Sequence, residues 1–270
     1  MTTLTARVVP IPARVLGRGG GRHIVERNFL LYRRSWIVFL SGFFEPLFYL
    51  LSIGIGVAQL VGDFTLSDGT TIGYAAFVAP AMLASSAMNG AIFDSTYNIF
   101  FRMKYAKLYD SMLATPLRPW DIATGEVTWA LLRGACYSAM FIAVMLGMGL
   151  ITSWWALLAL PASVLIAFAF AGAGMALTTF MRSWQDFEFV QLAAMPMFLF
   201  SATFYPVETY PEAIRWLVEI TPLYQGVVIE RALTTGTVGW FLLVHAFYLA
   251  AMGTIGMYIA SQRLGKLLLK

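Results

Sequence analysis

Long runs of apolar residues, separated by short polar segments, extend through most of the chain. A helix of about 20 apolar residues spans the hydrocarbon core of a membrane, and six runs reach or approach that length. They cover residues 36–60, 72–100, 122–151, 155–181, 187–205 and 240–262. The pattern predicts an all-α integral membrane protein with six transmembrane helices. We divide it into a cytoplasmic leader (1–35), a membrane domain (36–262) and a cytoplasmic tail (263–270).

The composition agrees with a lipid environment. Charged residues make up 12% and apolar residues 59% of the 270 residues, and the mean hydropathy is +0.73. A soluble domain usually carries about a quarter charged residues. Soluble enzymes, secreted disulfide-rich scaffolds and disordered chains are therefore excluded, and the single cysteine, Cys136, supports no internal disulfide.

The positive charges predict how the helices are oriented. Fifteen of the 18 Lys and Arg residues fall on one side of the six runs, two fall on the other side, and Arg133 lies inside a run. Cytoplasmic segments carry the excess of Lys and Arg, so we expect both termini in the cytoplasm. Because the cations separate by membrane side and do not cluster on a soluble face, no nucleic-acid partner is expected.

Residues 22–36 have an amphipathic pattern at helical spacing. One arc of the helical wheel is apolar and holds Ile24, Val25, Phe29, Leu31, Tyr32 and Trp36. The opposite arc holds His23, Glu26 and the cations Arg22, Arg27, Arg33 and Arg34. Such a helix would lie in the membrane surface with its arginines toward anionic lipid headgroups. The alternative is a plain basic flank of the first transmembrane helix, and the amphipathic pattern favours the interfacial helix.

Residues 102–113 form a second amphipathic segment, between the second and third runs. One face of the predicted helix holds Tyr105, Ala106, Leu108, Tyr109, Met112 and Leu113, and the other holds Lys104, Lys107, Asp110 and Ser111. Two prolines, Pro116 and Pro119, end the helix. Periodicity leaves two interpretations equally open: the helix docks into the groove of a partner protein, or it lies on the membrane surface.

The segment 205–224 follows the fifth run and predicts short helices on the outer side, too short to span a membrane. We single out its aromatic, proline and acidic residues: Tyr205, Pro206, Glu208, Pro211, Trp216 and Pro222. They form a gate at the mouth of a pathway in one interpretation and an inert connector in the other. Arg215 has ion-pair spacing to Glu212 and Glu219. We expect four carboxylates on the outer side, namely Glu208, Glu212, Glu219 and Glu230.

Four charged residues lie within or near the ends of the apolar runs: Glu45, Asp94, Glu126 and Arg133. An ionisable group at membrane depth is costly and usually faces a partner or a polar cavity. These residues line a pathway in one interpretation and hold the packing through salt bridges in the other. For the three carboxylates we favour the packing interpretation, because they lie near the ends of the runs. Glu126 and Arg133 are seven residues apart, too distant for a routine direct pair.

Several sequence motifs resemble those of one transporter family. Pro206-Val-Glu-Thr-Tyr-Pro211 and Thr221-Pro222-Leu223-Tyr224 resemble the outer-helix signature of type-2 ABC exporter permeases. The segment from Leu108 to Leu117 (LYDSMLATPL) is similar to the coupling-helix region of that family. Tyr74-Ala75-Ala76-Phe77 and Glu45-Pro46-Leu47-Phe48 resemble the nodulation lipo-oligosaccharide exporter branch. Asp94 and Asp110 depart from the pattern, because the family more often has Glu there.

The resemblance implies the permease subunit of an exporter in the inner (plasma) membrane. It assigns 102–113 as the coupling helix and 22–34 as the interfacial helix. Partners would be two copies of a cytoplasmic ABC ATPase, a second permease copy or sibling, and membrane lipids. No cofactor or metal is expected in this chain, and ATP and Mg would be bound by the ATPase. The sequence agrees with this division, because it contains no G-x-x-x-x-G-K-[ST] phosphate loop.

The resemblance also implies a cargo, an amphipathic or lipid-linked glycan such as a lipo-oligosaccharide or polysaccharide. Efflux of a hydrophobic drug or antibiotic by a permease of the same family is an alternative. A third possibility, from another class, is a membrane-embedded enzyme acting on a lipid-linked substrate with Glu45 and Asp94 as an acid–base pair. The sequence shows no nucleophile or metal-ligand cluster that would favour the enzyme.

Overall fold

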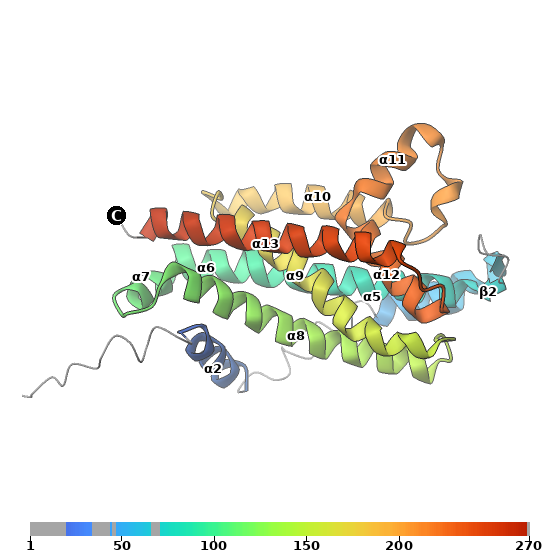
Figure 1. The fold of residues 1–270 in the computed structure, drawn as a ribbon, viewed down its shortest axis with the longest axis horizontal. Coiled ribbons are helices and arrows are strands. Elements are labelled where there is room, and N and C mark those ends of the chain that lie inside the picture. Colours follow the sequence, from blue (N-terminus) through green and yellow to red (C-terminus); the bar gives the residue numbers. More distant parts are fainter. Residues whose placement is uncertain (1–19, 34–43, 45–46, 66–70, 269–270) are drawn as a thin grey trace, which may run out of the picture.

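The computed structural model describes residues 20–33, 44, 47–65 and 71–268. Four helices in this part of the chain are long and apolar enough to cross a membrane: Tyr74–Lys104, Pro119–Gly147, Trp154–Thr178 and Phe241–Leu268. They lie side by side along the long axis of the molecule (Figure 1). The prediction of an all-α integral membrane protein is confirmed.

The first of these helices contains a local irregularity. It consists of α5 (Tyr74–Phe93), a π-helical turn η2 (Asp94–Asn98) and α6 (Ile99–Lys104). π-Helical turns inside α-helices are frequently found at functional sites. Here the turn places the carboxylate of Asp94 inside the bundle, where the residue is 7% exposed.

The other long helices are α8 (Pro119–Gly147), α9 (Ala159–Thr178, preceded by the 3-10 turn η3, Trp154–Leu158) and α13 (Phe241–Leu268). Helix α9 packs against α5, α8 and α13. The packing of α9 against α13 is close because glycines face each other. A Cβ atom on Gly256 of α13 would lie 2.6 Å from the backbone oxygen of Gly172 in α9. Small residues at such contacts are typical of membrane helices.

Two of the six predicted spans are not established by the structure. The span 36–60 lies partly outside the described residues. Its described part contains a π-helical turn, η1 (Ser52–Val57), and the short α4 (Ala58–Val61). The fifth corresponds to α10 (Phe187–Leu199), which follows the 3-10 turn η4 (Trp184–Asp186) and has only 13 residues. Six spans therefore remain a prediction.

Short elements cover the end of the bundle where β2 lies (Figure 1). Strands β1 (Asp63–Thr65) and β2 (Thr71–Gly73) form an antiparallel hairpin in which Asp63 pairs with Gly73. Between α10 and α13 come the 3-10 turn η5 (Val207–Thr209), α11 (Glu212–Ile220) and α12 (Pro222–Thr235). The side chain of Thr221 caps α12, which packs against α5, α9 and α13. Short helices are thus present where the sequence predicts them, and α12 enters the bundle.

The opposite end carries α7 (Leu108–Leu113), and α2 (Gly20–Arg33) lies against α8 (Figure 1). The prediction of one helix over 102–113 is wrong. Helix α6 ends at Lys104, and Lys107 has a left-handed backbone with φ of 44° before α7 begins. A non-glycine residue in this conformation interrupts a right-handed helix. The chain therefore turns between Lys104 and Leu108.

Candidate functional site

The loop carrying α7 presents polar side chains outward and apolar ones inward. Lys104, Lys107 and Asp110 are exposed, and Tyr105 is 61% exposed. The inward side of α7 holds Leu108, Met112 and Leu113, which are partly buried, and Tyr109, which is fully buried. Tyr105 does not share their face, contrary to the sequence prediction, because the turn at Lys107 separates it from α7. The exposed part of this hairpin is therefore short, polar and firmly anchored.

Tyr109 is the anchor. Its side chain has no exposed surface, and the charges of Glu126 in α8 and Arg102 in α6 act on its hydroxyl, which has no hydrogen-bond partner among the described residues. Burial raises the pKa of the Tyr109 phenol well above its usual value, and the charge of Glu126 raises it further. The phenol is therefore neutral at physiological pH. Tyr109 therefore holds α7 by burial of its ring, beside the charged groups and without carrying a charge itself.

Those charged groups form a cluster around Glu126, which we call the Glu126 cluster: Arg27, Asn28, Arg102 and Glu126. The Glu126 carboxylate accepts hydrogen bonds from Asn28 Nδ2 at 3.1 Å and Arg27 Nη2 at 3.3 Å, both from α2. It also forms an ion pair with Arg102 of α6. Glu126 is 4% exposed, and a carboxylate removed from water in this way must be compensated by such partners. The cluster ties α2, α6 and α8 together directly behind α7.

Helix α2 comes close to α8 because Gly125 has no side chain. A Cβ atom there would lie 2.7 Å from Cβ of Ile24 and 2.8 Å from the backbone oxygen of Gly21. Ile24 and Asn28 are accordingly buried against α8. The position of α2 is thus determined by backbone contact as well as by the ion pairs.

The arrangement of α2 differs from the predicted one in two respects. Ile24, expected on the apolar arc with Phe29, faces α8 instead, and Arg27, expected toward the headgroups, is paired with Glu126. Arg22 remains exposed and pairs with Glu26 at 2.8 Å. The side chain of Arg33 and the whole of Arg34 lie outside the described residues. Apolar side chains that are more than half exposed cover the free side of α2, namely Phe29, Leu30 and Leu31.

A second buried ion pair joins α8 to the π-helical turn. Arg133 of α8 binds the carboxylate of Asp94, which also accepts a hydrogen bond from Asn98 Nδ2 at 2.7 Å. Arg133 donates to the Tyr32 hydroxyl of α2 at 3.3 Å. Asp94 and Glu126 are therefore both held in salt bridges that connect helices, as in the packing interpretation. Glu45 lies outside the described residues.

At the opposite end, the residues of the predicted gate lie around α11. The rings of Tyr205 and Tyr210 lie tilted against each other, with centroids 4.8 Å apart, and Trp216 is 61% exposed. Glu208 and Pro211 are exposed, and Pro206 and Pro222 are half-buried. The predicted pairs of Arg215 with Glu212 and Glu219 do not form. Arg215 donates instead to the backbone oxygen of Glu208 at 3.1 Å. Glu208 lies in the short turn η5, where its backbone oxygen is free to accept this bond.

The sequence prediction is wrong for one of the four carboxylates expected on the outer side. Glu230 is fully buried and accepts a hydrogen bond from Ser163 of α9 at 2.8 Å. Its second oxygen has no partner among the described residues. The error arises because α12 packs into the bundle and does not lie on its surface.

Sequence reasoning gave no role in this site to three residues that shape it: Asn28, Gly125 and Arg102. Asn28 lies on the buried side of α2. The segment around it mixes polar and apolar residues, so the sequence gave no sign that this particular polar residue is buried. Gly125 could have been recognised from its place beside Glu126, since a glycine within a long helix usually marks close packing. The sequence places Arg102 at the start of a separate helix over 102–113, whereas it lies in the last turn of α6, which continues the helix Tyr74–Lys104.

Residues 22–234 match the family model described as ABC-2 type transporter. The chain is similar to Nodulation protein J of Rhizobium leguminosarum bv. viciae, with 33% identity over 216 residues, covering 78% of this chain and 80% of that protein. It is also similar to Nodulation protein J of Rhizobium meliloti (strain 1021), with 29% identity over 247 residues, covering 90% and 92% of the two chains.

Proposed function

Because the chain belongs to the ABC-2 type transporter family, we propose that it is the permease subunit of an ATP-driven exporter in the inner membrane. The cargo is an amphipathic or lipid-linked glycan, taken from the cytoplasm or the inner leaflet. The similarity to Nodulation protein J and the motifs of the nodulation lipo-oligosaccharide exporter branch support this cargo. The permease itself carries out no chemical reaction.

In the proposed topology both termini and α7 are cytoplasmic. The strong bias of Lys and Arg toward one side supports this orientation. Helix α7 and the C-terminal end of α13 also lie at the same end of the bundle (Figure 1). The outer side then carries the β1–β2 hairpin, η5 and α11.

Transport requires a partner that binds and hydrolyses ATP together with Mg. Permeases of this family generally work with a cytoplasmic ABC ATPase, and we propose two ATPase copies on a pair of permeases. The second permease is either another copy of this chain or a sibling. The α7 hairpin is the surface that docks the ATPase.

The observation that carries the proposal is the contrast between the two sides of α7. Asp110 is exposed and available to a partner, whereas Tyr109, one residue earlier, is buried against the Glu126 cluster. A rigid anchor transmits a displacement, because close-packed interiors deform little. Closure of the ATPases on nucleotide binding would push α7, and Tyr109 would pass the motion to α2, α6 and α8.

The test uses the permease co-expressed with its ATPase. We expect Asp110→Ala and Tyr109→Ala each to reduce ATP-dependent uptake of cargo into inside-out vesicles, with altered assembly or ATP hydrolysis. Asp63→Ala removes an exposed aspartate at the opposite end and should leave uptake unchanged. Full transport by the double variant of Asp110 and Tyr109 would disprove the role of α7.

Efflux of a hydrophobic drug or antibiotic is a second candidate, favoured by an apolar groove of about 510 Å³ between α9, α10 and α13. Apolar pockets of roughly 300–1,000 Å³ are typical of small-molecule sites. Competition separates the two candidates. A glycan exporter should take up a labelled glycolipid and lose that uptake when unlabelled glycolipid is added, and a drug exporter should take up a hydrophobic dye and lose that uptake when other apolar drugs are added.

A further inference from the structure

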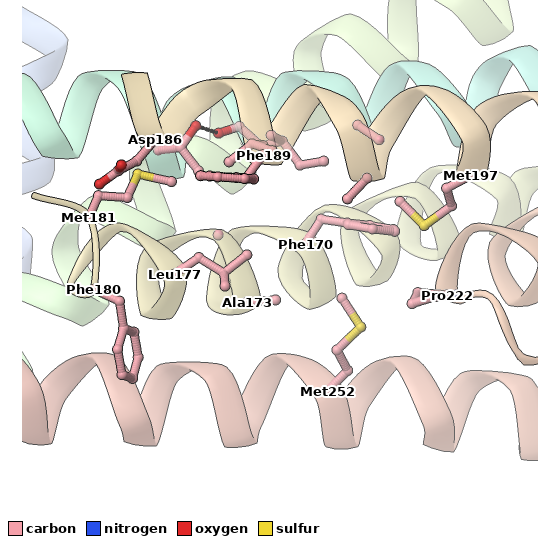
Figure 2. Close-up of a pocket in the computed structure, with 16 residues that line it drawn as sticks. Phe170, Ala173, Leu177, Phe180, Met181, Asp186, Phe189, Met197, Pro222 and Met252 are labelled. Atoms are coloured by element: carbon pink, nitrogen blue, oxygen red, sulfur yellow. Dashed lines mark hydrogen bonds between the residues drawn. The ribbon is translucent and has the colours of Figure 1, made fainter. Parts of the chain in front are cut away.

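A groove of about 510 Å³ lies on the side of the bundle, between α9, α10 and α13. Figure 2 shows Phe170 and Leu177 of α9 between the other two helices, which carry Met197 and Met252. Leu177 and Phe189 line the groove and are more than half exposed, so the groove opens on the outside of the bundle. In a membrane this surface faces hydrocarbon chains, which offer no hydrogen bonds.

The groove has the length of one leaflet of a bilayer. Its lining on α9 runs from Phe170 to Leu177 and continues beyond the helix to Phe180, about 15 Å at roughly 1.5 Å per residue. The hydrocarbon core of a bilayer is about 30 Å thick. Met252 lies near the middle of the span Phe241–Leu268, and Phe180 lies beyond the end of α9. The groove therefore extends from the middle of the membrane to the surface at the α7 end, as an acyl chain of one leaflet does.

The polar groups in the lining of the groove already have partners. The hydroxyl of Thr96 donates to the backbone oxygen of Ile92 at 2.6 Å. The carboxylate of Asp186 accepts hydrogen bonds from the backbone amides of Arg182 at 2.6 Å and Ser183 at 3.2 Å. These bonds lower the pKa of Asp186, and the charge of Arg182 lowers it further. Asp186 is therefore ionised and offset by Arg182, and a ligand in the groove meets mainly hydrocarbon groups.

Two cations of α13 lie at the α7 end of the groove. The guanidinium of Arg263 lies 3.6 Å from the ring centre of Phe180, a ring that points from the end of α9 toward α13 (Figure 2). Arg263 donates to the hydroxyl and the backbone oxygen of Thr179, which are both neutral. At 3.6 residues per turn, Arg263 and the exposed Lys266 share the helix face of Met252. Among the described residues, no carboxylate forms an ion pair with either cation.

We propose that the groove binds one acyl chain of an anionic phospholipid, with the phosphate beside Arg263 and Lys266. The length of the groove selects a lipid of a single leaflet, and the unpaired cations select a negative headgroup. A zwitterionic lipid carries its own ammonium group and gains less from these cations, and an apolar drug gains nothing from them. In the proposed orientation this is the cytoplasmic leaflet, so the inference rests on the proposed function in that respect alone.

The bound chain holds α10 against the bundle. Of the 13 residues of α10, all of them described, only Phe187 and Ala194 are buried. A chain in the groove packs against Ala193 and Met197 of α10 and against α9 on the other side. It thereby supplies dispersion contacts that this helix lacks.

The experiment measures lipid binding to the complex of permease and ATPase, without ATP or cargo. The complex is placed in phosphatidylcholine nanodiscs that contain a small amount of phosphatidylglycerol with a photoreactive diazirine at the end of one acyl chain. Phosphatidylcholine with the same photoreactive chain is the comparison. Because the headgroup is held at Arg263, the chain end should label the far end of the groove, at Met197 and Met252. We expect phosphatidylglycerol to label these residues about fivefold more than phosphatidylcholine, the effect of roughly one cation on an anionic lipid.

Two variants at Arg263 separate charge from packing. Arg263→Gln together with Lys266→Gln removes both cations and should lower phosphatidylglycerol labelling to the phosphatidylcholine level. Arg263→Lys loses the same bonds to Thr179 but keeps the positive charge, so most of the labelling should remain. Labelling by phosphatidylcholine should be equal in the unaltered protein and both variants, which shows that the groove is intact.

A second pair of variants tests whether the chain lies in the groove. Ala193→Phe places a ring in the groove from α10 and should reduce labelling by both lipids. Leu192→Phe is the matched control, because Leu192 is 70% exposed and lies outside the groove lining. It should leave labelling by both lipids unchanged.

Three results would overturn the proposal. Equal labelling of the unaltered protein by the two lipids would mean that the groove takes any membrane lipid. An equal loss in Arg263→Lys and in the double variant would mean that Arg263 supports the fold and not the headgroup. Absence of labelling by both lipids would assign the groove to a second permease copy or to an apolar drug. Loss of export in the α7 experiment would instead contradict the proposed function and leave the lipid site standing.

Discussion

The guanidinium of Arg133 in α8 binds the carboxylate of Asp94 in the π-helical turn η2, and both residues are at least 90% buried. The two residues are 39 positions apart, so the pair fixes the relation between two transmembrane helices. Removing one member leaves the other charge buried without a counter-ion, which is far more costly than removing both.

Neutralising Asp94 should therefore destabilise the protein strongly. We expect Asp94→Asn to lower the free energy of unfolding by about 3–5 kcal/mol, the usual cost of breaking a buried pair. Thermal unfolding of the detergent-solubilised protein measures this change. The double variant Asp94→Leu with Arg133→Met should recover most of the loss. A double variant less stable than either single variant would contradict the role of the pair.

Glu126 should control whether α2 stays attached to α8. In Glu126→Gln the cations Arg27 and Arg102 lose their counter-charge, so α2 should detach and trypsin should cut at Arg27 much faster. Glu26→Gln is the matched control, because Glu26 pairs only with exposed partners on its own helix. Limited proteolysis followed by mass spectrometry measures the rate of cleavage at Arg27 in both variants. Equal cleavage at Arg27 in the two proteins would contradict the Glu126 cluster as the attachment of α2.

The sequence predicts the long helices well because each is an apolar run of about the length of a bilayer core. It also predicts that the third run, which corresponds to α8, begins near residue 122. In the structure the helix begins slightly earlier, at Pro119, and the Asp121 carboxylate accepts a hydrogen bond from the backbone amide of Arg118 at 3.0 Å. Local patterns suffice for such features because the interactions that create them are local.

Features that depend on distant partners could not be predicted in the same way. Glu126 binds Arg27, 99 residues earlier, and no periodicity encodes that contact. The turn at Lys107 also gave no signal, because neither Gly nor Pro marks it and a lysine takes the left-handed conformation. The residues proposed for coupling could therefore be named from periodicity and motifs, whereas tertiary packing decides their arrangement.

Glu230 provides a contrast with Asp94. It is fully buried, yet its one hydrogen bond comes from Ser163, and no cation among the described residues pairs with it. A carboxyl buried in this way costs least in its neutral form, which glutamine resembles in shape. Glu230→Gln should therefore change the free energy of unfolding by less than about 1 kcal/mol. Thermal unfolding of the Glu230→Gln and Asp94→Asn variants, measured side by side, tests this expectation. If Glu230→Gln lowers the free energy of unfolding as much as Asp94→Asn does, Glu230 carries a paired charge.

The contact between α9 and α13 should tolerate no added methyl group at Gly256. A Cβ atom there would lie 2.6 Å from the backbone nitrogen of Ala173, and backbone atoms cannot move aside as a side chain would. We expect Gly256→Ala to lower the free energy of unfolding by about 1–3 kcal/mol, the range for overpacked interiors. Gly134→Ala in α8 is the control, because its Cβ would meet only the Cβ of Ala167 at 3.7 Å. Alanine also favours helix over glycine by about 1 kcal/mol, so this control should be neutral or stabilising. If thermal unfolding ranks the two variants in the opposite order, the close approach of α9 and α13 is not what holds this part of the bundle together.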